Sequence, residues 1–201
     1  MWLPRYSRPW KHNMAKLYFH FGAMGSSKTA NALLVYHNYI DKGQKALIAK
    51  PAIETRDGNL IKSRSGLEGP CLTLEALIEM PVKALQEYDC IIIDEIQFAN
   101  EQQVEFLADI VDTLHIPVMC YGLRTDFRGL LFEGSRRLFE LADKIIEIKT
   151  VCWCGRKATH NARYNEHGII REGDQIVLGA DDKYISLCRK HHQQGLVRKP
   201  Q

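Results

Sequence analysis

Short apolar runs alternate with longer amphipathic segments along most of the chain. Apolar residues recur at helical spacing in the longer segments, as at Ala32, Leu33, Val35 and Tyr36, and this spacing predicts helices. The apolar runs predict strands at 17–21, 46–49, 90–93, 117–121 and 145–148. Strands separated by helix-sized segments favour an α/β fold, with a parallel sheet covered by helices on both faces.

Capping residues place two of the helices. Thr73 and Asn100 each stand before an apolar-periodic segment, where a side-chain oxygen can accept a hydrogen bond from the first helical turn. Pro81 interrupts the helix that Thr73 begins. Residues 51–70 mix charges with three glycines and show no period, so we expect a loop there.

The character of the chain changes after Lys149. Cysteines cluster, Gly and Asp become frequent, and helical periodicity disappears. We therefore expect an α/β domain at 14–150 and a small C-terminal domain at 151–201. Residues 1–13 are basic and aromatic, and they predict a loose tail or an upstream extension.

Composition narrows the classes of protein. With 27 basic and 24 acidic residues the formal charge is +3, which is too balanced to indicate nucleic acid binding. No apolar run approaches the ~18 residues of a membrane span, so no membrane partner is expected. Six cysteines without a signal peptide favour a reducing, cytoplasmic location.

The first chemical motif lies between the first predicted strand and helix, where a phosphate-binding loop belongs. Backbone N–H groups at a helix N-terminus cradle phosphate, a Lys reaches the β- and γ-phosphate oxygens, and a Thr hydroxyl holds Mg²⁺. In the pattern G-x-x-x-x-G-K-[ST], Ser27 replaces the second Gly, at a cost of about 1–2 kcal/mol if that position needs a positive φ. The candidate loop is Gly22, Ala23, Met24, Gly25, Ser26, Ser27, Lys28 and Thr29.

The second motif ends the most apolar strand. Asp94 and Glu95 follow Ile93 directly, at the sheet edge where parallel α/β folds bind ligands. We expect Asp94 to hold Mg²⁺ together with Thr29, and Glu95 to take a proton from the attacking group. Gln97 joins the candidates for ATP and phosphate binding. In the plainer interpretation, both carboxylates simply end a strand in solvent.

The third motif is a pair of cysteine groups. Cys152 and Cys154 precede a long segment that ends in Cys188 and His191, and two close pairs separated by a loop are a common tetrahedral zinc site. Four ligands would close the shell, which predicts a structural Zn²⁺. His192 is an alternative fourth ligand.

Together these stretches resemble the bacterial branch of the type II (cytosolic) thymidine kinase family. The resemblance runs from about Lys16 to His192, and its most specific parts are 121–129, 152–158 and 179–191. It implies a P-loop (RecA-like) parallel sheet with a small zinc-binding lasso domain. It also implies ATP-dependent phosphorylation of the thymidine 5′-hydroxyl to dTMP, with deoxyuridine as a further substrate, in pyrimidine deoxynucleotide salvage for DNA synthesis.

The resemblance also assigns residues and partners. Arg64 would lie near the phosphates. The nucleoside contacts would come from Met24, Phe98, Leu123, Phe127, Ile176, Val177, Leu178, Gly179 and Tyr184. Feedback inhibition by dTTP and a homotetramer are further expectations. Ser27 and Glu54 depart from the family pattern, and neither change removes a catalytic group.

Two other classes of function stay open at this point. One is a P-loop ATPase or nucleotide switch whose zinc module binds a partner, which thymidine-independent release of ADP would reveal. The other is a zinc-ribbon nucleic-acid binder that uses the basic tail, which salt-dependent binding would reveal.

Overall fold

The computed structural model describes residues 15–54, 58–176 and 183–199. Within them a six-stranded parallel sheet has the order β5-β2-β6-β7-β1-β8. The five predicted strands are all present, and the two-residue β5 completes the sheet. Their bounds are β1 Leu17–Phe21, β2 Ala46–Lys50, β5 Leu72–Thr73, β6 Cys90–Ile93, β7 Val118–Gly122 and β8 Lys144–Glu147.

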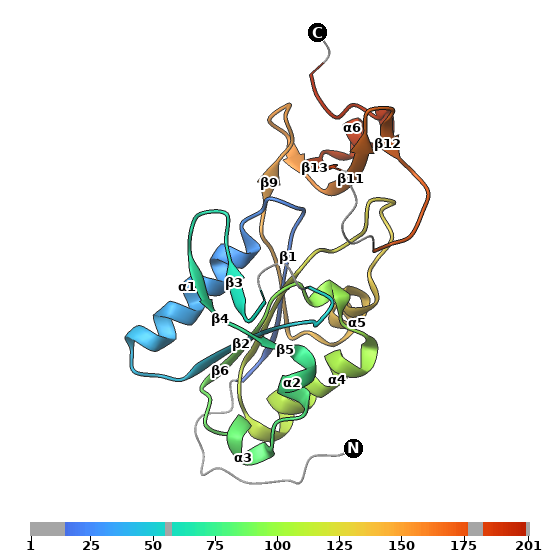
Figure 1. Ribbon diagram of the computed structural model, residues 1–201. Helices are drawn as coiled ribbons and strands as arrows, with labels where there is room; N and C mark the ends of the chain where they lie inside the picture. The colour runs from blue at the N-terminus through green and yellow to red at the C-terminus, as the bar shows by residue number, and fades with distance from the viewer. Residues whose placement is uncertain (1–14, 55–57, 177–182, 200–201) are drawn as a thin grey trace.

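Helices cover both faces of this sheet, as predicted (Figure 1). Helix α1 (Lys28–Asp41) packs on one face, where Ala32 and Leu33 join a buried cluster with Ile48 and Tyr121. The other face carries α2 (Leu74–Ile78), α3 (Val82–Leu85), α4 (Glu101–Asp109), the π-helical turn η2 (Ile110–Leu114) and α5 (Glu133–Leu141). The four residues of β6 are fully buried between these layers, which explains why they are all apolar or Cys.

The predicted caps are confirmed. The Thr73 hydroxyl accepts a hydrogen bond from the N–H of Ala76 at 3.1 Å. Asn100 and Gln103 form a reciprocal capping box, with 2.8 Å from the Gln103 N–H to Asn100 Oδ1 and 3.0 Å from the Asn100 N–H to Gln103 Oε1. These contacts set the start of α2 and α4 beside the sheet.

The loop predicted over 51–70 is wrong in its second half. It contains an antiparallel hairpin of β3 (Leu60–Lys62) and β4 (Glu68–Pro70), which lies against α1. Each strand buries only its central residue, Ile61 or Gly69, so no periodic pattern is long enough to detect. A Cβ on Gly69 would lie 3.1 Å from Leu33, which shows how closely the hairpin approaches α1.

The C-terminal module, described over residues 150–176 and 183–199, contains short antiparallel strands. It contains the hairpin β9 (Thr150–Val151) and β10 (Lys157–Ala158). A three-stranded sheet follows, in the order β12 (Gly168–Ile170), β11 (His160–Asn165) and β13 (Lys183–Leu187). Helix α6 (Arg189–Gln194) was not predicted, because six polar residues carry no apolar period.

In Figure 1 the C-terminal module lies beyond the carboxyl ends of the main strands, on the side of the loop between β1 and α1. Among the described residues, no helix is long and apolar enough to cross a membrane. The predicted tail at 1–13 lies outside the described residues.

Candidate active site and metal centre

The loop between β1 and α1 has the geometry that its sequence predicts. Ser27 has φ 60° and ψ 30°, so a non-glycine residue occupies the left-handed conformation at the position of the missing Gly. The strain expected for Ser27, about 1–2 kcal/mol, is therefore present. Gly22 is required for a different reason, since a Cβ there would lie 2.4 Å from both the Ile148 carbonyl oxygen and Ser26 Oγ.

Lys28 is buried inside this loop, with 8% of its surface exposed. Its ammonium donates hydrogen bonds to the carbonyl oxygens of Ala23 at 3.1 Å and Gly22 at 3.4 Å, and to Ser26 Oγ at 3.5 Å. Burial lowers the pKa of Lys28, while Glu95 and then Asp94 oppose that shift. The loop therefore holds a desolvated cation against uncharged oxygen atoms, an arrangement that suits a phosphate-binding lysine.

The Asp94 carboxyl group reaches the start of α1. Thr29 Oγ1 donates a hydrogen bond to Asp94 Oδ2 at 2.8 Å, and Asp94 itself is 3% exposed. Burial, followed by repulsion from Glu95, raises the pKa of Asp94 to about 7, and the Thr29 bond and Lys28 oppose the rise. A hydroxyl and a carboxylate oxygen at this separation are oxygen ligands of the kind Mg²⁺ takes, so Thr29 and Asp94 could hold the ion.

Glu95 is braced by Gln97. Glu95 has φ 52°, a left-handed conformation that turns the chain from β6 into the 3₁₀ helix η1 (Ile96–Phe98). Gln97 Nε2 donates to Glu95 Oε2 at 2.5 Å, and Gln97 Oε1 accepts from the Leu123 N–H at 2.9 Å. These contacts favour a positioning role for Gln97 over the phosphate contact expected from the sequence.

The predicted wall residues gather around the same sheet edge. Met24 and Leu123 are half-buried, and Phe127 is buried beneath the guanidinium groups of Arg163 at 5.3 Å and Arg128 at 5.5 Å from its ring centre. The half-buried Phe98 instead contacts the ring of Phe132 edge-on, with 5.9 Å between ring centres.

Asn161 is a site residue that the sequence analysis missed. It lies on β11, is 4% exposed, and accepts a hydrogen bond from the Met24 N–H at 2.8 Å. Its amide nitrogen donates to the Thr125 carbonyl oxygen at 3.0 Å. One side chain of the C-terminal module thus ties the phosphate loop to the loop after β7, and both loops line a pocket with Arg124 and Thr159. No local pattern distinguishes such an Asn from an ordinary surface Asn.

The remaining residues predicted to contact the substrates are exposed or half-buried where the structure describes them. Arg64 is exposed in the turn between β3 and β4, and its charge adds to the burial that lowers the pKa of Lys28. Ile176 is half-buried, and Tyr184 on β13 is 39% exposed. Val177, Leu178 and Gly179 lie outside the described residues.

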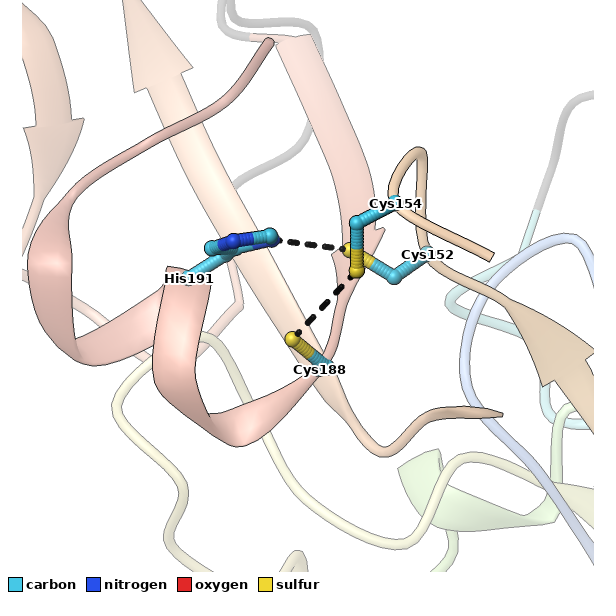
Figure 2. Close-up of side chains that lie close together, drawn as sticks. All are labelled: Cys152, Cys154, Cys188 and His191. Carbon is cyan, nitrogen blue, oxygen red and sulfur yellow. Dashed lines mark hydrogen bonds between the residues drawn. The ribbon is translucent and has the colours of Figure 1, made fainter. Parts of the chain in front are cut away.

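The predicted metal ligands converge in the C-terminal module (Figure 2). The ligand atoms of Cys152, Cys154, Cys188 and His191 all lie within 4.8 Å of one another. Cys154 Sγ is 4.0 Å from Cys188 Sγ, and His191 Nδ1 is 3.4 Å from Cys152 Sγ. Two thiolates on one tetrahedral Zn²⁺ stand about 3.8 Å apart, so this donor set fits zinc.

Neighbouring groups favour metal binding by these four residues and hold their side chains in place. A hydrogen bond from the backbone of Arg156 lowers the pKa of the Cys154 thiol, which favours the thiolate that metals bind. The Trp153 ring stacks on His191, with 4.0 Å between ring centres and 5° between planes. His192, the alternative ligand, is engaged elsewhere, because its Nε2 lies 2.9 Å from the Phe127 carbonyl oxygen.

A family model described as thymidine kinase matches residues 15–192. The chain belongs to the thymidine kinase family. Curated thymidine kinases match it over nearly their whole length. That of Vibrio parahaemolyticus is 44% identical over 190 residues, which cover 91% of this chain and 99% of the relative. That of Vibrio cholerae is 45% identical over 92% of this chain and 100% of the relative. That of Enterobacteria phage T4 is 47% identical over 89% of this chain and 95% of the relative.

Membership in the thymidine kinase family agrees with the site. The family match covers the phosphate loop, the acidic pair and the four cysteine and histidine ligands in one continuous span. The resemblance noted from the sequence is therefore confirmed.

Proposed function

We propose that this protein is a thymidine kinase, which transfers the γ-phosphate of ATP to the 5′-hydroxyl of thymidine and yields dTMP. One observation carries the proposal. Lys28, Thr29, Asp94 and Glu95 converge at the carboxyl edge of the sheet, in a chain whose curated relatives over nearly its full length are thymidine kinases.

The phosphate loop supplies the charge and the fixed N–H groups that ATP needs. Lys28 is held among the backbone carbonyls of the loop, and the first turn of α1 presents its N–H groups in the same direction. Thr29 and Asp94 would hold Mg²⁺, which neutralises the charge of the transferred phosphoryl group. These residues orient the donor, and little covalent work falls to the protein.

Glu95 is the proposed general base. It follows Asp94 directly in the sequence, and its backbone is in the left-handed conformation. The Gln97 side chain bridges the Glu95 carboxylate and the Leu123 N–H, which holds the carboxylate in place. A carboxylate held in this way can accept the proton of the 5′-hydroxyl as the oxygen attacks phosphorus. Gln97 keeps the carboxylate in place and does not itself take part in the proton transfer.

The nucleoside would lie against Met24, Leu123, Phe127 and Phe98, with Ile176 and Tyr184 beside it. A flat base suits an apolar slot that has a few fixed polar groups. Deoxyuridine differs only by one methyl group, so we expect it to be a weaker substrate. Val177, Leu178 and Gly179 stay predictions for the same contact.

We assign zinc a structural role. Three thiolates and one imidazole complete a tetrahedral shell, so no coordination position remains for substrate. The ion would fix β9, the start of α6 and the segment between them.

A coupled kinase assay with ATP, Mg²⁺ and each deoxynucleoside in turn tests the proposal. Phosphorylation of thymidine, with little use of purine deoxynucleosides or deoxycytidine, is expected. ATP hydrolysis that ignores thymidine would favour an ATPase or nucleotide switch instead. Glu95→Gln, which should still bind thymidine, is the matched inactive control.

We further propose a homotetramer that dTTP inhibits. Exposed apolar side chains support self-association, namely Ile145 and Ile146 on the edge strand β8, and Leu34 and Ile40 on α1. Sedimentation at several protein concentrations tests the assembly, and titration of dTTP against thymidine tests the inhibition.

A further inference from the structure

The loop after β7 contains a carboxylate with no exposed side-chain surface. Asp126 lies in the segment 125–131, next to the wall residue Phe127. Its Oδ1 accepts hydrogen bonds from the backbone N–H groups of Arg128 and Leu130, both at 2.9 Å. This oxygen therefore shapes the turn of its own loop.

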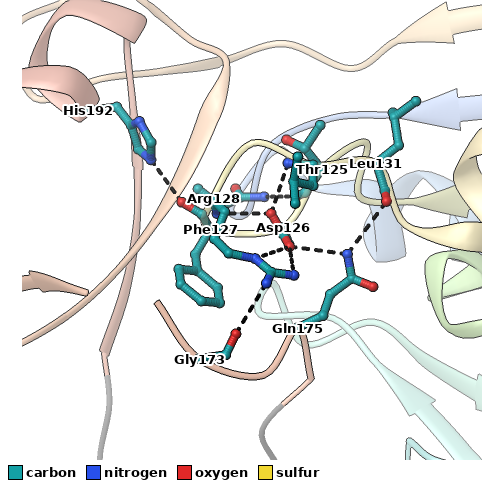
Figure 3. Close-up of polar contacts among 10 residues, drawn as sticks. Thr125, Asp126, Phe127, Arg128, Leu131, Gly173, Gln175 and His192 are labelled. Carbon is teal, nitrogen blue, oxygen red and sulfur yellow. Dashed lines mark hydrogen bonds and ion pairs between the residues drawn. The ribbon is translucent and has the colours of Figure 1, made fainter. Parts of the chain in front are cut away.

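The other oxygen of Asp126 faces the C-terminal module (Figure 3). Oδ2 accepts from Arg128 Nε at 2.9 Å, Arg128 Nη2 at 2.8 Å and Gln175 Nε2 at 3.1 Å. Arg128 Nη1 reaches on to the Gly173 carbonyl oxygen at 3.3 Å. The segment 173–175 of the module is thus tied to the loop that follows β7.

A second tie reaches the same loop from α6. His192 Nε2 lies within hydrogen-bond distance of the Phe127 carbonyl oxygen, and Arg171 contacts both Nδ1 and the carbonyl oxygen of His192. Phe127 is consequently held on its backbone by His192, while its neighbours Asp126 and Arg128 are held by 173–175. Both ties join the loop that carries Phe127 to the module, in addition to the bond from Asn161 to the Thr125 carbonyl oxygen.

We infer that Asp126 is a positioning residue for nucleoside binding, which fixes Phe127 and the segment 173–175 to each other through Arg128 and Gln175. The inference rests on the proposed function for its kinetic consequence. Charge-assisted hydrogen bonds to a buried carboxylate are among the stronger ones in proteins, so this tie has the strength to hold two modules. None of its contacts involves the loop 22–29, so it should act on the nucleoside and leave ATP alone.

Two substitutions separate the cross-module tie from the turn. Asp126→Asn can keep its single carbonyl oxygen on the N–H groups of Arg128 and Leu130, while its NH₂ group faces the donors of Arg128 and Gln175. Gln175→Met keeps the length of the side chain and removes the amide group that donates to Asp126 Oδ2 and, at 3.5 Å, to the Leu131 carbonyl oxygen. Glu166→Gln is the control, because Glu166 lies 85% exposed in the same module.

We expect Asp126→Asn to raise the KM for thymidine about tenfold and Gln175→Met about threefold, with the KM for ATP changed less than twofold. The double variant should be close to Asp126→Asn, because both changes remove the contact between Gln175 and Asp126 and only the long bond to the Leu131 carbonyl oxygen distinguishes them. Equal rises in both KM values, or an unchanged KM for thymidine, would overturn the inference.

Hydrogen exchange gives a readout that does not need catalysis. In Asp126→Asn the amides of 171–175 should exchange faster than in the wild type, while zinc content stays stoichiometric and β1, β6 and β7 stay protected. Unchanged exchange at 171–175 would refute the tie itself. If the wild type fails to phosphorylate thymidine, the proposed function fails, and exchange still decides whether Asp126 holds the two segments.

Discussion

The phosphate loop and the proposed nucleoside wall are assembled in different ways. The phosphate loop is continuous, because eight successive residues, from the end of β1 into the first turn of α1, carry its charge, its turn and the hydroxyl that we propose for Mg²⁺. Apart from Met24, this wall draws on the segments after β6 and β7, and Asn161 and Asp126 connect the segment after β7 to the C-terminal module. A continuous site depends on local conformation, whereas an assembled site depends on contacts between distant segments.

The largest predicted effect lies where the two regions meet. Glu95→Gln keeps the size of the side chain and one oxygen that can accept from Gln97 but removes the base, so turnover should fall about 10²–10⁴-fold. Thymidine binding, measured by calorimetry, should persist. Near-normal turnover in this variant would remove Glu95 from the role of general base.

Loss of zinc should disrupt the proposed nucleoside wall and leave the phosphate loop intact. Cys188→Ser removes one of four ligands, so we expect loss of stoichiometric metal and at least a tenfold rise in the KM for thymidine. ATP binding to the phosphate loop should survive in part. Cys71→Ala, at a buried cysteine of the α/β domain, should keep its metal and serves as the control. A metal-free variant with wild-type thymidine kinetics would contradict the structural role of zinc.

The pH dependence of stability tests the protonation state of Asp94, whose carboxyl group contacts the phosphate loop at Thr29. Burial raises the pKa of Asp94 in the folded protein to about 7, above the ordinary value of 3.8. The folded state therefore binds this proton more tightly than the unfolded state does. The contribution of the protonated group to stability is complete below about pH 4, and it is lost as the pH rises toward 7.

Urea unfolding of the ligand-free protein between pH 4 and 8 measures this effect. We expect the free energy of unfolding to fall with rising pH relative to Asp94→Asn, whose side chain does not titrate. Mg²⁺·ATP should bind more tightly as the pH rises through 7, because the ion needs the carboxylate. Parallel stability curves for the two proteins would show that Asp94 is already ionised.

The smallest predicted effect is confined to the phosphate loop. Ser27→Gly relieves a left-handed non-glycine conformation, so the protein should gain about 1 kcal/mol of stability, with the KM for ATP unchanged or lower. Gly25 offers the matched opposite change, since it has φ 72° in open space and Gly25→Ser should cost a similar amount. Loss of ATP binding in Ser27→Gly would make Ser27 a specialised ligand.

The same contrast explains how much could be predicted from the sequence. Strands, caps, the phosphate loop and the acidic pair follow from patterns within a few residues, and the structure has them where they were expected. The candidate zinc ligands were predicted although Cys154 and Cys188 are 34 positions apart, because Cys and His carry a strong chemical signature. The choice of His191 over His192 needed the contact between His192 and Phe127.

Other features could not be predicted for physical reasons. The strands β3 and β4 bury one residue each, and α6 buries only His192, so none shows an apolar period. Asn161 and Gln175 are ordinary polar residues in the sequence, and only burial against distant backbone atoms gives them a role.

The close contact between Gly22 and Ile148 has a mechanical consequence. The chain leaves β8 and passes against the first residue of the phosphate loop before it enters the C-terminal module, and the Ile148 N–H donates to the Phe21 carbonyl oxygen at 2.7 Å. A few residues on, the Thr150 hydroxyl donates to the Gly25 carbonyl oxygen at 3.3 Å. The start of the C-terminal module is therefore anchored directly to the candidate phosphate loop, so a displacement of one is transmitted to the other at this point.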